Sequence, residues 1–424
     1  KVKEYQYKNC RSEFPFNAEF FSTYLNNFSF ALLKYWIKKI SFFQLILAYF
    51  KEFYACVNLN NYKLIQSYKH SDNFKKIILT WGNETNLKDN FFFDKYLNIS
   101  TSDYKEILWI VLYDGDSSKI EKLDNVAYII NNNTPIYQKL SNFCIWFLNS
   151  IYKKKLKYKN FLHFFSWHNF YSYKILEIIK PFFNQNLQEL FIAYEAQPFQ
   201  TRIIRYIKKN FLKIKCIGYI NTFPSFAPHF IKKSFSPDVI IVNSINQSDA
   251  LTKYLGWSKD EIELIDSARF RIKEKHNMIN KIYIPINFSS SIKILIDFKE
   301  LFEYLKNYDL SSFEISNHPT TKKSIKHLNL IESIRALLKN HKGGIKKISN
   351  TSICVGFTSS VVEALFYGVN VFHITEEPIF ESYDNNFWKN ITIKEENRHV
   401  REYLTNNKNF VLFGKDDSII KKYI

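Results

Sequence analysis

The chain is poor in cysteine and has no long hydrophobic run. Its five cysteines are scattered through 424 residues without the close pairs of a zinc site or a disulfide framework, which favours a reducing, cytoplasmic compartment. The most apolar early stretch, residues 40–50, is far shorter than the roughly 20 residues that span a bilayer, so we expect no transmembrane segment. The sequence begins with Lys and without a leader pattern, and we interpret it as a fragment of a longer chain.

Acidic residues are outnumbered by basic ones. There are 59 Lys and Arg against 40 Asp and Glu, a net charge of +19, which predicts attraction to polyanions such as nucleic acid, an anionic membrane or a phosphorylated small molecule. The lysines are spread along the chain, and no nucleic-acid-binding motif appears. We therefore expect no nucleic-acid partner, and a non-enzymatic polyanion-binding protein is the less favoured alternative.

Aromatic residues are abundant, at 18% of the chain, which indicates a folded protein, and the length favours two or more domains. Residues 1–69 show helical spacing and then a polar break at 58–69, which predicts an N-terminal helical segment. Residues 70–275 and 276–424 each alternate apolar runs, the last at 409–414, with helix-length segments. This pattern predicts an α/β protein of GT-B geometry: two Rossmann-like doubly wound domains facing a cleft, with an N-terminal helical extension.

A run of hydroxyl side chains in the last domain follows a buried strand and opens a helix. Thr358, Ser359 and Ser360 come directly after the strand 352–357, and hydroxyls with backbone N–H groups at a helix start can bind a phosphate. Ser360 and Glu363 also fit a capping box that needs no ligand. His318 follows the strand 313–316, and a histidine at the end of a parallel strand can donate to the same phosphate.

Carboxylates follow two predicted strands of the first domain. Glu195 comes directly after the strand 190–193 and ahead of a helix that begins near Pro198. It can take a proton from an acceptor hydroxyl, or it can cap the helix. Asp114 and Asp116 follow the strand 107–112 and could hold a divalent metal, although Asp-Gly is also a common turn pair, and we favour the turn.

These residues resemble the motifs of bacterial surface-polysaccharide glycosyltransferases of the GT-B type that use CMP-activated acidic sugars, the sialyltransferase and Kdo-transferase group. His318-Pro319 and the pair Ser359-Ser360 are similar to the HP motif and the serine pair of that group. The stretch YEAQPFQ at 194–200 and SPDVIIVNS at 236–244 are similar to segments of surface carbohydrate biosynthesis proteins. The group often has an acidic-acidic-Gly motif, and Tyr113-Asp114-Gly115 lacks its first acid.

The resemblance implies an inverting, metal-independent glycosyltransferase of capsule or lipopolysaccharide synthesis. It implies transfer of an acidic sugar, Kdo or sialic-acid-like, from a CMP-sugar to a glycan or lipid-linked glycan, with no cofactor beyond the donor. The first domain would then serve the acceptor and the second would bind the nucleotide sugar. A GT-B enzyme that uses a UDP- or GDP-sugar is the alternative.

The resemblance also assigns roles to the candidate residues. Glu195 becomes the catalytic base, with Asp114 as its competitor, and Glu363 contacts the ribose or completes the helix cap. The N-terminal helices would rest on the anionic inner face of the plasma membrane. The residues that would hold the donor phosphate are His318, Pro319, Thr358, Ser359 and Ser360.

Overall fold

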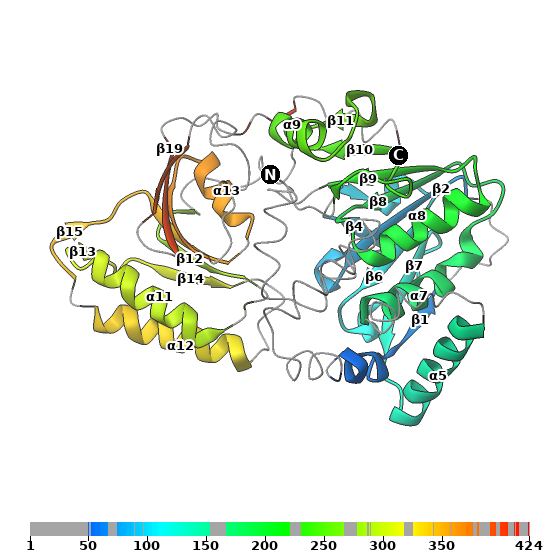
Figure 1. Ribbon diagram of the computed structural model, residues 1–424, viewed down its shortest axis with the longest axis horizontal. Coiled ribbons are helices and arrows are strands. Elements are labelled where there is room, and N and C mark those ends of the chain that lie inside the picture. Colours follow the sequence, from blue (N-terminus) through cyan, green and yellow to red (C-terminus); the bar gives the residue numbers. More distant parts are fainter. Residues whose placement is uncertain are drawn as a thin grey trace.

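The structure is a computed structural model. It describes residues 50, 52–66, 74–88, 90–95, 97–152, 167–220, 230–266, 278–285, 288, 290–317, 325–341, 343–356, 358–375, 380, 391–395, 399–405, 411, 413, 414 and 423. The N-terminal helices predicted before residue 50 lie outside the described residues, and residues 52–57 are helical. Figure 1 shows the arrangement of the elements.

The first unit is built on an eight-stranded sheet in the order β1-β7-β6-β2-β8-β9-β10-β11. Its strands after β1 pair in parallel, and β1 pairs with β7 in the antiparallel sense. All seven residues of β6 are buried, as expected for a central parallel strand. The strands are β1 (Asn61–Ile65), β2 (Lys76–Gly82), β6 (Ile107–Tyr113), β7 (Val126–Asn132), β8 (Glu189–Ala193), β9 (Lys215–Tyr219), β10 (Val239–Val242) and β11 (Ile262–Leu264).

The two faces of this sheet are covered differently. One face packs against α7 (Trp167–Ile179), α8 (Pro198–Asn210) and α9 (Ile245–Tyr254). The other packs against Phe92 and Leu97, around the short strands β3 (Leu87–Lys88), β4 (Phe91–Asp94) and β5 (Ile99–Ser100). Outside these layers α5 (Ile136–Tyr152) packs on α7 (Figure 1). Short 3-10 turns are η1 (Glu84–Asn86), η2 (Thr101–Asp103), η3 (Ser117–Lys119), η5 (Lys180–Phe182) and η7 (Lys259–Glu261).

The second unit is built on a six-stranded sheet in the order β14-β12-β16-β17-β19-β18. The first four strands are parallel, and β18 and β19 form an antiparallel hairpin at one edge. The remaining pair, β13 and β15, is a separate parallel ladder. The strands are β12 (Lys281–Ile284), β13 (Tyr308–Asp309), β14 (Glu314–Asn317), β15 (Lys346–Lys347), β16 (Thr351–Val355), β17 (Asn370–Ile374), β18 (Ile391–Glu395) and β19 (Val400–Thr405).

Helices lie on both faces of the second sheet (Figure 1). Because side chains alternate along a strand, Ile353 and Val355 pack in a cluster with α11 (Ser291–Tyr304) and α12 (Ile325–Asn340), whereas Cys354 packs on α13 (Ser360–Phe366). The predicted fold class is confirmed: two Rossmann-like α/β units follow one another in the chain, as in the GT-B type.

Two expectations were wrong in detail. Residues 61–65, expected within a polar break, form the edge strand β1. The apolar run at 409–414 was expected to be a strand of the second unit. Phe413 instead makes an isolated bridge to Ser244 of the first unit.

The C-terminal end of the chain returns to the first unit. Tyr423 is 4% exposed and belongs to the cluster under the β3–β5 face. Its backbone oxygen accepts a hydrogen bond from Lys76 Nζ at 2.9 Å, its hydroxyl donates to Glu263, and Lys215 Nζ lies 4.8 Å from its ring centre. The first unit is therefore completed by a residue from the far end of the sequence.

We expect Tyr423→Ala to lower the free energy of unfolding by about 3 kcal/mol, because it removes a buried aromatic ring and leaves a cavity. Urea unfolding followed by tryptophan fluorescence measures this, since Trp109 lies in the same cluster. Leu212→Ala, at a side chain that is 90% exposed, is the control and should unfold like the wild type. Equal midpoints for Tyr423→Ala and the control would show that the C-terminal contact does not stabilise the first unit.

Candidate functional site

Glu195 lies where the strand order of the first sheet reverses. From β2 the chain builds β6 and β7 on one side, and then crosses to β8, β9 and β10 on the other. Ligands of such sheets bind in the crevice at the carboxyl ends of the two strands that flank the reversal. Here these are β2, which ends at Gly82, and β8, which ends at Ala193, two residues before Glu195.

A strained turn holds the Glu195 carboxylate. Ala196 is buried and left-handed, with φ +54°, a conformation that costs a residue with a Cβ about 1 kcal/mol or more. Gln200 Oε1 accepts hydrogen bonds from the backbone N–H groups of Glu195 and Gln197 at 3.0 and 3.1 Å, and its Nε2 donates to Ala193 O at 2.7 Å. Gln197 Nε2 donates to Glu195 Oε2 at 2.8 Å.

This network bears on the helix-capping role considered for Glu195. Gln197 is the N-cap residue of α8 and forms a capping box with Gln200, and Pro198 is the first helical residue. The helix is capped by the glutamines, so the expectation that Glu195 itself caps α8 is wrong. Burial raises the pKa of the Glu195 carboxyl above its ordinary value, and the hydrogen bond from Gln197 opposes this. A raised pKa suits a carboxylate that exchanges protons near neutral pH.

Asp114 and Asp116 lie on the other side of β2. The Asp114 backbone N–H donates to Gly82 O at 2.8 Å, and the Asp114 side chain is exposed. Asp116 is the N-cap residue of η3, and its carboxylate accepts from the Ser118 N–H and hydroxyl at 3.0 and 2.8 Å. The interpretation of this segment as a turn is confirmed. Within the described parts of the chain, no three His, Cys, Asp or Glu residues gather as candidate metal ligands, and binding of a metal by Asp114 and Asp116 with a diphosphate is not tested by this.

An aromatic group near the reversal point was not predicted from the sequence. The Trp81 ring meets Phe199 edge-on at 6.2 Å, and Phe199 meets Tyr171 at 5.7 Å. Tyr62 packs on Tyr171 at 5.5 Å. Burial, together with the charge of Asp114, raises the pKa of Tyr62 to about 12.

The hydroxyl cluster opens α13 in the second unit. Thr358, Ser359 and Ser360 are partly exposed, and Thr358 Oγ1 accepts from the Ser360 N–H at 3.3 Å. Ser359 is the N-cap residue and makes no side-chain capping bond. The strand order of this sheet reverses between β12 and β16, and the cluster follows β16. As predicted, it therefore lies at the carboxyl end of a strand at the reversal point.

Glu363 does not cap the helix. It belongs to α13 and is fully buried, at 0% exposed, on the side toward Cys354 and Tyr283, where its charge contributes to raising the pKa of both groups. The capping box between Ser360 and Glu363 does not form, because Ser360 is already the first helical residue. The capping interpretation is wrong, and contact between Glu363 and the ribose stays a prediction.

His318 and Pro319 lie outside the described residues. The strand that leads to them, β14, runs parallel to β12, as does β16. The carboxyl ends of β14 and β16 therefore lie on one rim with β12 between them, so the expectation that the two motifs follow parallel strands of the same sheet is confirmed. Contact between His318 and the hydroxyls stays a prediction.

His373 was missed because it is one polar residue in the apolar strand β17. It is fully buried, and its Nε2 lies 2.7 Å from Gly356 O and its Nδ1 3.4 Å from the Tyr403 hydroxyl. The Gly356 N–H donates to Ile374 O at 2.8 Å, and Gly356 is left-handed with φ +65°. His373 thus fixes the turn that leads to the hydroxyl cluster. Burial lowers its pKa to about 4, so the ring is neutral and donates from Nε2.

The two units meet through Phe413. Its ring packs on Phe366 of α13 at 4.9 Å, and its backbone pairs with Ser244, the N-cap residue of α9. Gly414 N–H donates to Asn243 O at 3.1 Å. Asn243 and Ser244 follow β10, on the rim that also carries Glu195 two strands away. The helix that carries the hydroxyl cluster is therefore tied to the carboxyl rim of the first sheet.

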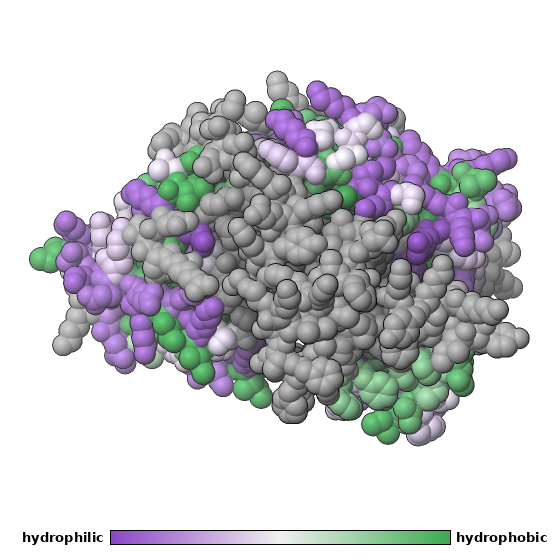
Figure 2. Space-filling view, viewed as in Figure 1, coloured by the Kyte–Doolittle hydropathy of each residue, from purple (hydrophilic) through white to green (hydrophobic). Residues whose placement is uncertain are grey.

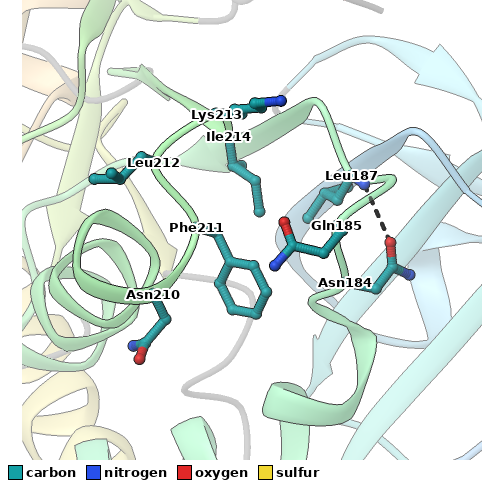
Figure 3. Close-up of a pocket in the computed structure, with 8 residues that line it drawn as sticks. All are labelled: Asn184, Gln185, Leu187, Asn210, Phe211, Leu212, Lys213 and Ile214. Atoms are coloured by element: carbon teal, nitrogen blue, oxygen red, sulfur yellow. Dashed lines mark hydrogen bonds between the residues drawn. The ribbon is translucent and has the colours of Figure 1, made fainter.

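A pocket of about 240 Å³ lies at the opposite rim of the first sheet. Figure 3 shows Phe211 and Gln185 pointing into it from two loops. These loops precede β8 and β9, at the amino ends of the strands, so the pocket is separated from Glu195 by the length of the sheet. Its lining residues are Asn184, Gln185, Leu187, Asn210, Phe211, Leu212, Lys213 and Ile214.

Comparisons with known proteins give weak structural similarity only. No protein-family model matches the chain, and no curated protein matches it. A UDP-GlcNAc 2-epimerase from Neisseria meningitidis bound to UDP-GlcNAc is 12% identical, with 72% of this chain and 85% of that chain covered and a TM-score of 0.35.

Two further solved structures are similar to the same extent. The S. aureus MnaA structure with UDP is 12% identical, with 72% and 80% covered and a TM-score of 0.37. A glycosyltransferase from Rickettsia africae is 12% identical, with 72% and 85% covered and a TM-score of 0.31. Because these TM-scores are below 0.5, we base the site on the residues of this chain. Among the described helices, none is both long and apolar enough to cross a bilayer.

The buried His373 predicts acid sensitivity. Its pKa of about 4 in the folded protein lies below the ordinary 6.5, so the unfolded chain binds more protons between these values. The contribution of His373 to stability is therefore complete above about pH 6.5 and falls by about 3 kcal/mol as the pH approaches 4. Chemical unfolding across this pH range measures it. His373→Gln, whose amide can donate to Gly356 O, should lose this part of the pH dependence, and parallel curves for the two proteins would contradict the assignment.

Proposed function

We propose that this chain is an inverting glycosyltransferase that moves an acidic sugar, of the Kdo or sialic-acid kind, from a CMP-sugar to a glycan or lipid-linked glycan of the cell surface. The reaction would take place at the cytoplasmic face of the membrane. The observation that carries the proposal is the partly buried carboxylate of Glu195, held by Gln197 at the point where the first sheet reverses its strand order.

In the proposed reaction, Glu195 accepts the proton of an acceptor hydroxyl. The hydroxyl oxygen attacks the anomeric carbon of the donor, the bond from that carbon to the CMP phosphate oxygen breaks, and CMP leaves with the electron pair. Thr358, Ser359 and Ser360 donate to the leaving phosphate, and His318-Pro319 completes that contact. Each such donor is worth roughly a hundredfold in rate.

Three features support this assignment. The raised pKa of Glu195 suits a general base. The hydroxyl cluster follows β16 at the reversal point of the second sheet. Phe413 packs on Phe366 at the end of α13 and pairs with Ser244 after β10, so the second unit contacts the carboxyl rim of the first sheet.

Glu195→Gln should lower the transfer rate by about a hundredfold or more, because the amide cannot take the proton. Nucleotide binding should be unchanged, since the donor contacts come from the second unit. The pH profile of the wild type should lose rate on the acid side at a higher pH than for an ordinary Glu, because burial raises the pKa of Glu195. Initial rates measured across pH check both points.

Asp114→Asn is the matched control, because it removes a carboxylate two strands away, on the other side of β2. It should retain most of the activity. An inactive Asp114→Asn with an active Glu195→Gln would assign the base to Asp114. Loss of activity in EDTA and in Asp116→Asn would support a metal-dependent reaction instead.

Among CMP, UDP and GDP, we expect CMP to give the largest increase in melting temperature, since ligands that bind the folded state stabilise it. Ser359→Ala and Ser360→Ala should each reduce the CMP shift. Ser333→Ala on α12, whose hydroxyl donates to Asn329 O at 2.9 Å, is the control. A larger shift with UDP or GDP would replace the CMP assignment. No shift with any nucleotide, together with retardation of nucleic acid in a gel, would favour the polyanion-binding alternative.

A further inference from the structure

Helix α5 is apolar on both its inner and its outer side. Phe143 and Trp146 are 4% and 3% exposed and pack against Phe170 of α7 at 5.8 and 4.7 Å. The opposite side carries large hydrophobic side chains in solvent. The exposed hydrophobic residues of the helix are Ile136, Tyr137, Leu140, Ile145 and Leu148, between 47% and 68% exposed.

Tyr137, Leu140 and Leu148 lie on one outward face, which we call the α5 face, whereas Ile136 lies seven residues before Phe143 and so on the packed side. Tyr137, Leu140, Cys144 and Leu148 follow each other at spacings of three and four residues and so lie along one line of the helix. Cys144 is also exposed. The helix contains no Asp or Glu, and its one basic residue, Lys139, is partly buried at the edge of the packed side. The α5 face therefore carries no charge.

Exposed aromatic residues extend the α5 face. Phe50, Phe53 and Tyr54 are 66%, 44% and 70% exposed, and the Phe53 ring meets Phe143 of α5 edge-on at 5.3 Å. Figure 2 shows the resulting hydrophobic patch over α5 at the lower right of the molecule. Contiguous apolar patches of this kind mark interaction sites on soluble proteins.

Positive charge follows α5 in the sequence, as Lys153-Lys154-Lys155-Leu156-Lys157. The whole chain carries +19. Two copies of this chain meeting through the α5 face would each carry this net charge, and like charges oppose such a contact. An anionic surface fits the combination.

We propose that α5 docks this protein on an anionic lipid bilayer, lying in the plane of the interface. The α5 face enters the boundary between headgroups and acyl chains, and the net positive charge of the chain attracts it to lipid phosphates. A 17-residue helix is about 25 Å long and too short to cross the bilayer, but it can lie along its surface. The inference extends the proposed function to where the protein works and does not depend on the donor nucleotide.

The test is co-sedimentation of the full chain with vesicles of phosphatidylcholine alone or mixed with phosphatidylglycerol, without nucleotide or acceptor. We expect binding to the mixed vesicles that weakens between about 0.1 M and about 1 M salt, where screening shortens the reach of charges. Leu140→Glu with Leu148→Glu should weaken it by about tenfold or more, since two apolar side chains no longer enter the lipid. The two side chains are exposed, so the fold should be retained.

The matched control is Leu212→Glu with Ile345→Glu, which adds the same charge at side chains that are 90% and 100% exposed elsewhere. It should bind like the wild type. A fluorophore on Cys144, in a chain with Cys10→Ser, reports the depth of α5 directly, because Cys56, Cys216 and Cys354 are buried. Its emission should shift to the blue with mixed vesicles only.

Three outcomes would overturn the proposal. The first is no binding to mixed vesicles. The second is equal loss of binding in the test and control variants, which would show a general charge effect. The third is a fluorophore on Cys144 that is shielded without lipid and in proportion to protein concentration, which would assign the α5 face to a second copy. Since no nucleotide is present, none of these results bears on the CMP assignment.

Discussion

A largely enclosed carboxylate has to be held by donors, and the turn after β8 supplies them. Gln197 donates to Glu195. Gln200 accepts hydrogen bonds from the backbone N–H groups of the turn and donates to the carbonyl of Ala193. This arrangement requires the left-handed backbone of Ala196. The strain is tolerated because the same glutamines cap α8. The position of the proposed base and the start of the helix beside it thus depend on one network.

In the second unit, a histidine side chain holds the corresponding turn. The turn at Gly356 is held to β17 by two hydrogen bonds, one from the Gly356 N–H and one from the His373 ring. The residues that follow this turn lie at the rim of the sheet. In both units a buried polar side chain from a regular element fixes the loop that carries the proposed chemistry. A loop fixed in this way keeps its groups in place without a bound ligand, which lowers the entropy lost on binding.

The strands that could be predicted from the sequence are those that appear in it as a continuous pattern of residue types. The buried strands β2, β6, β8 and β16 are largely apolar runs and were all expected. The strand β1 was not, because NYKLI is a half-buried edge strand, and the β18–β19 hairpin alternates charged with apolar residues. Likewise, the position of Glu195 after a strand could be predicted. The capping role of Gln197 depends on the exact residue at which α8 begins, and the burial of His373 depends on neighbours that are distant in sequence, so neither could be predicted.

Helix α7 connects the two surfaces that the proposals use. Its Phe170 packs on Trp146 of α5, and the next residue, Tyr171, packs on Phe199 at the start of α8, four residues after Glu195. Neighbouring helices are about 8–10 Å apart, so two such steps, or about 20 Å, separate α5 from α8. Under the two proposals, an acceptor sugar carried on a lipid headgroup would have to bridge a distance of this order. A bilayer on the α5 face would therefore present its glycan to the rim that holds Glu195.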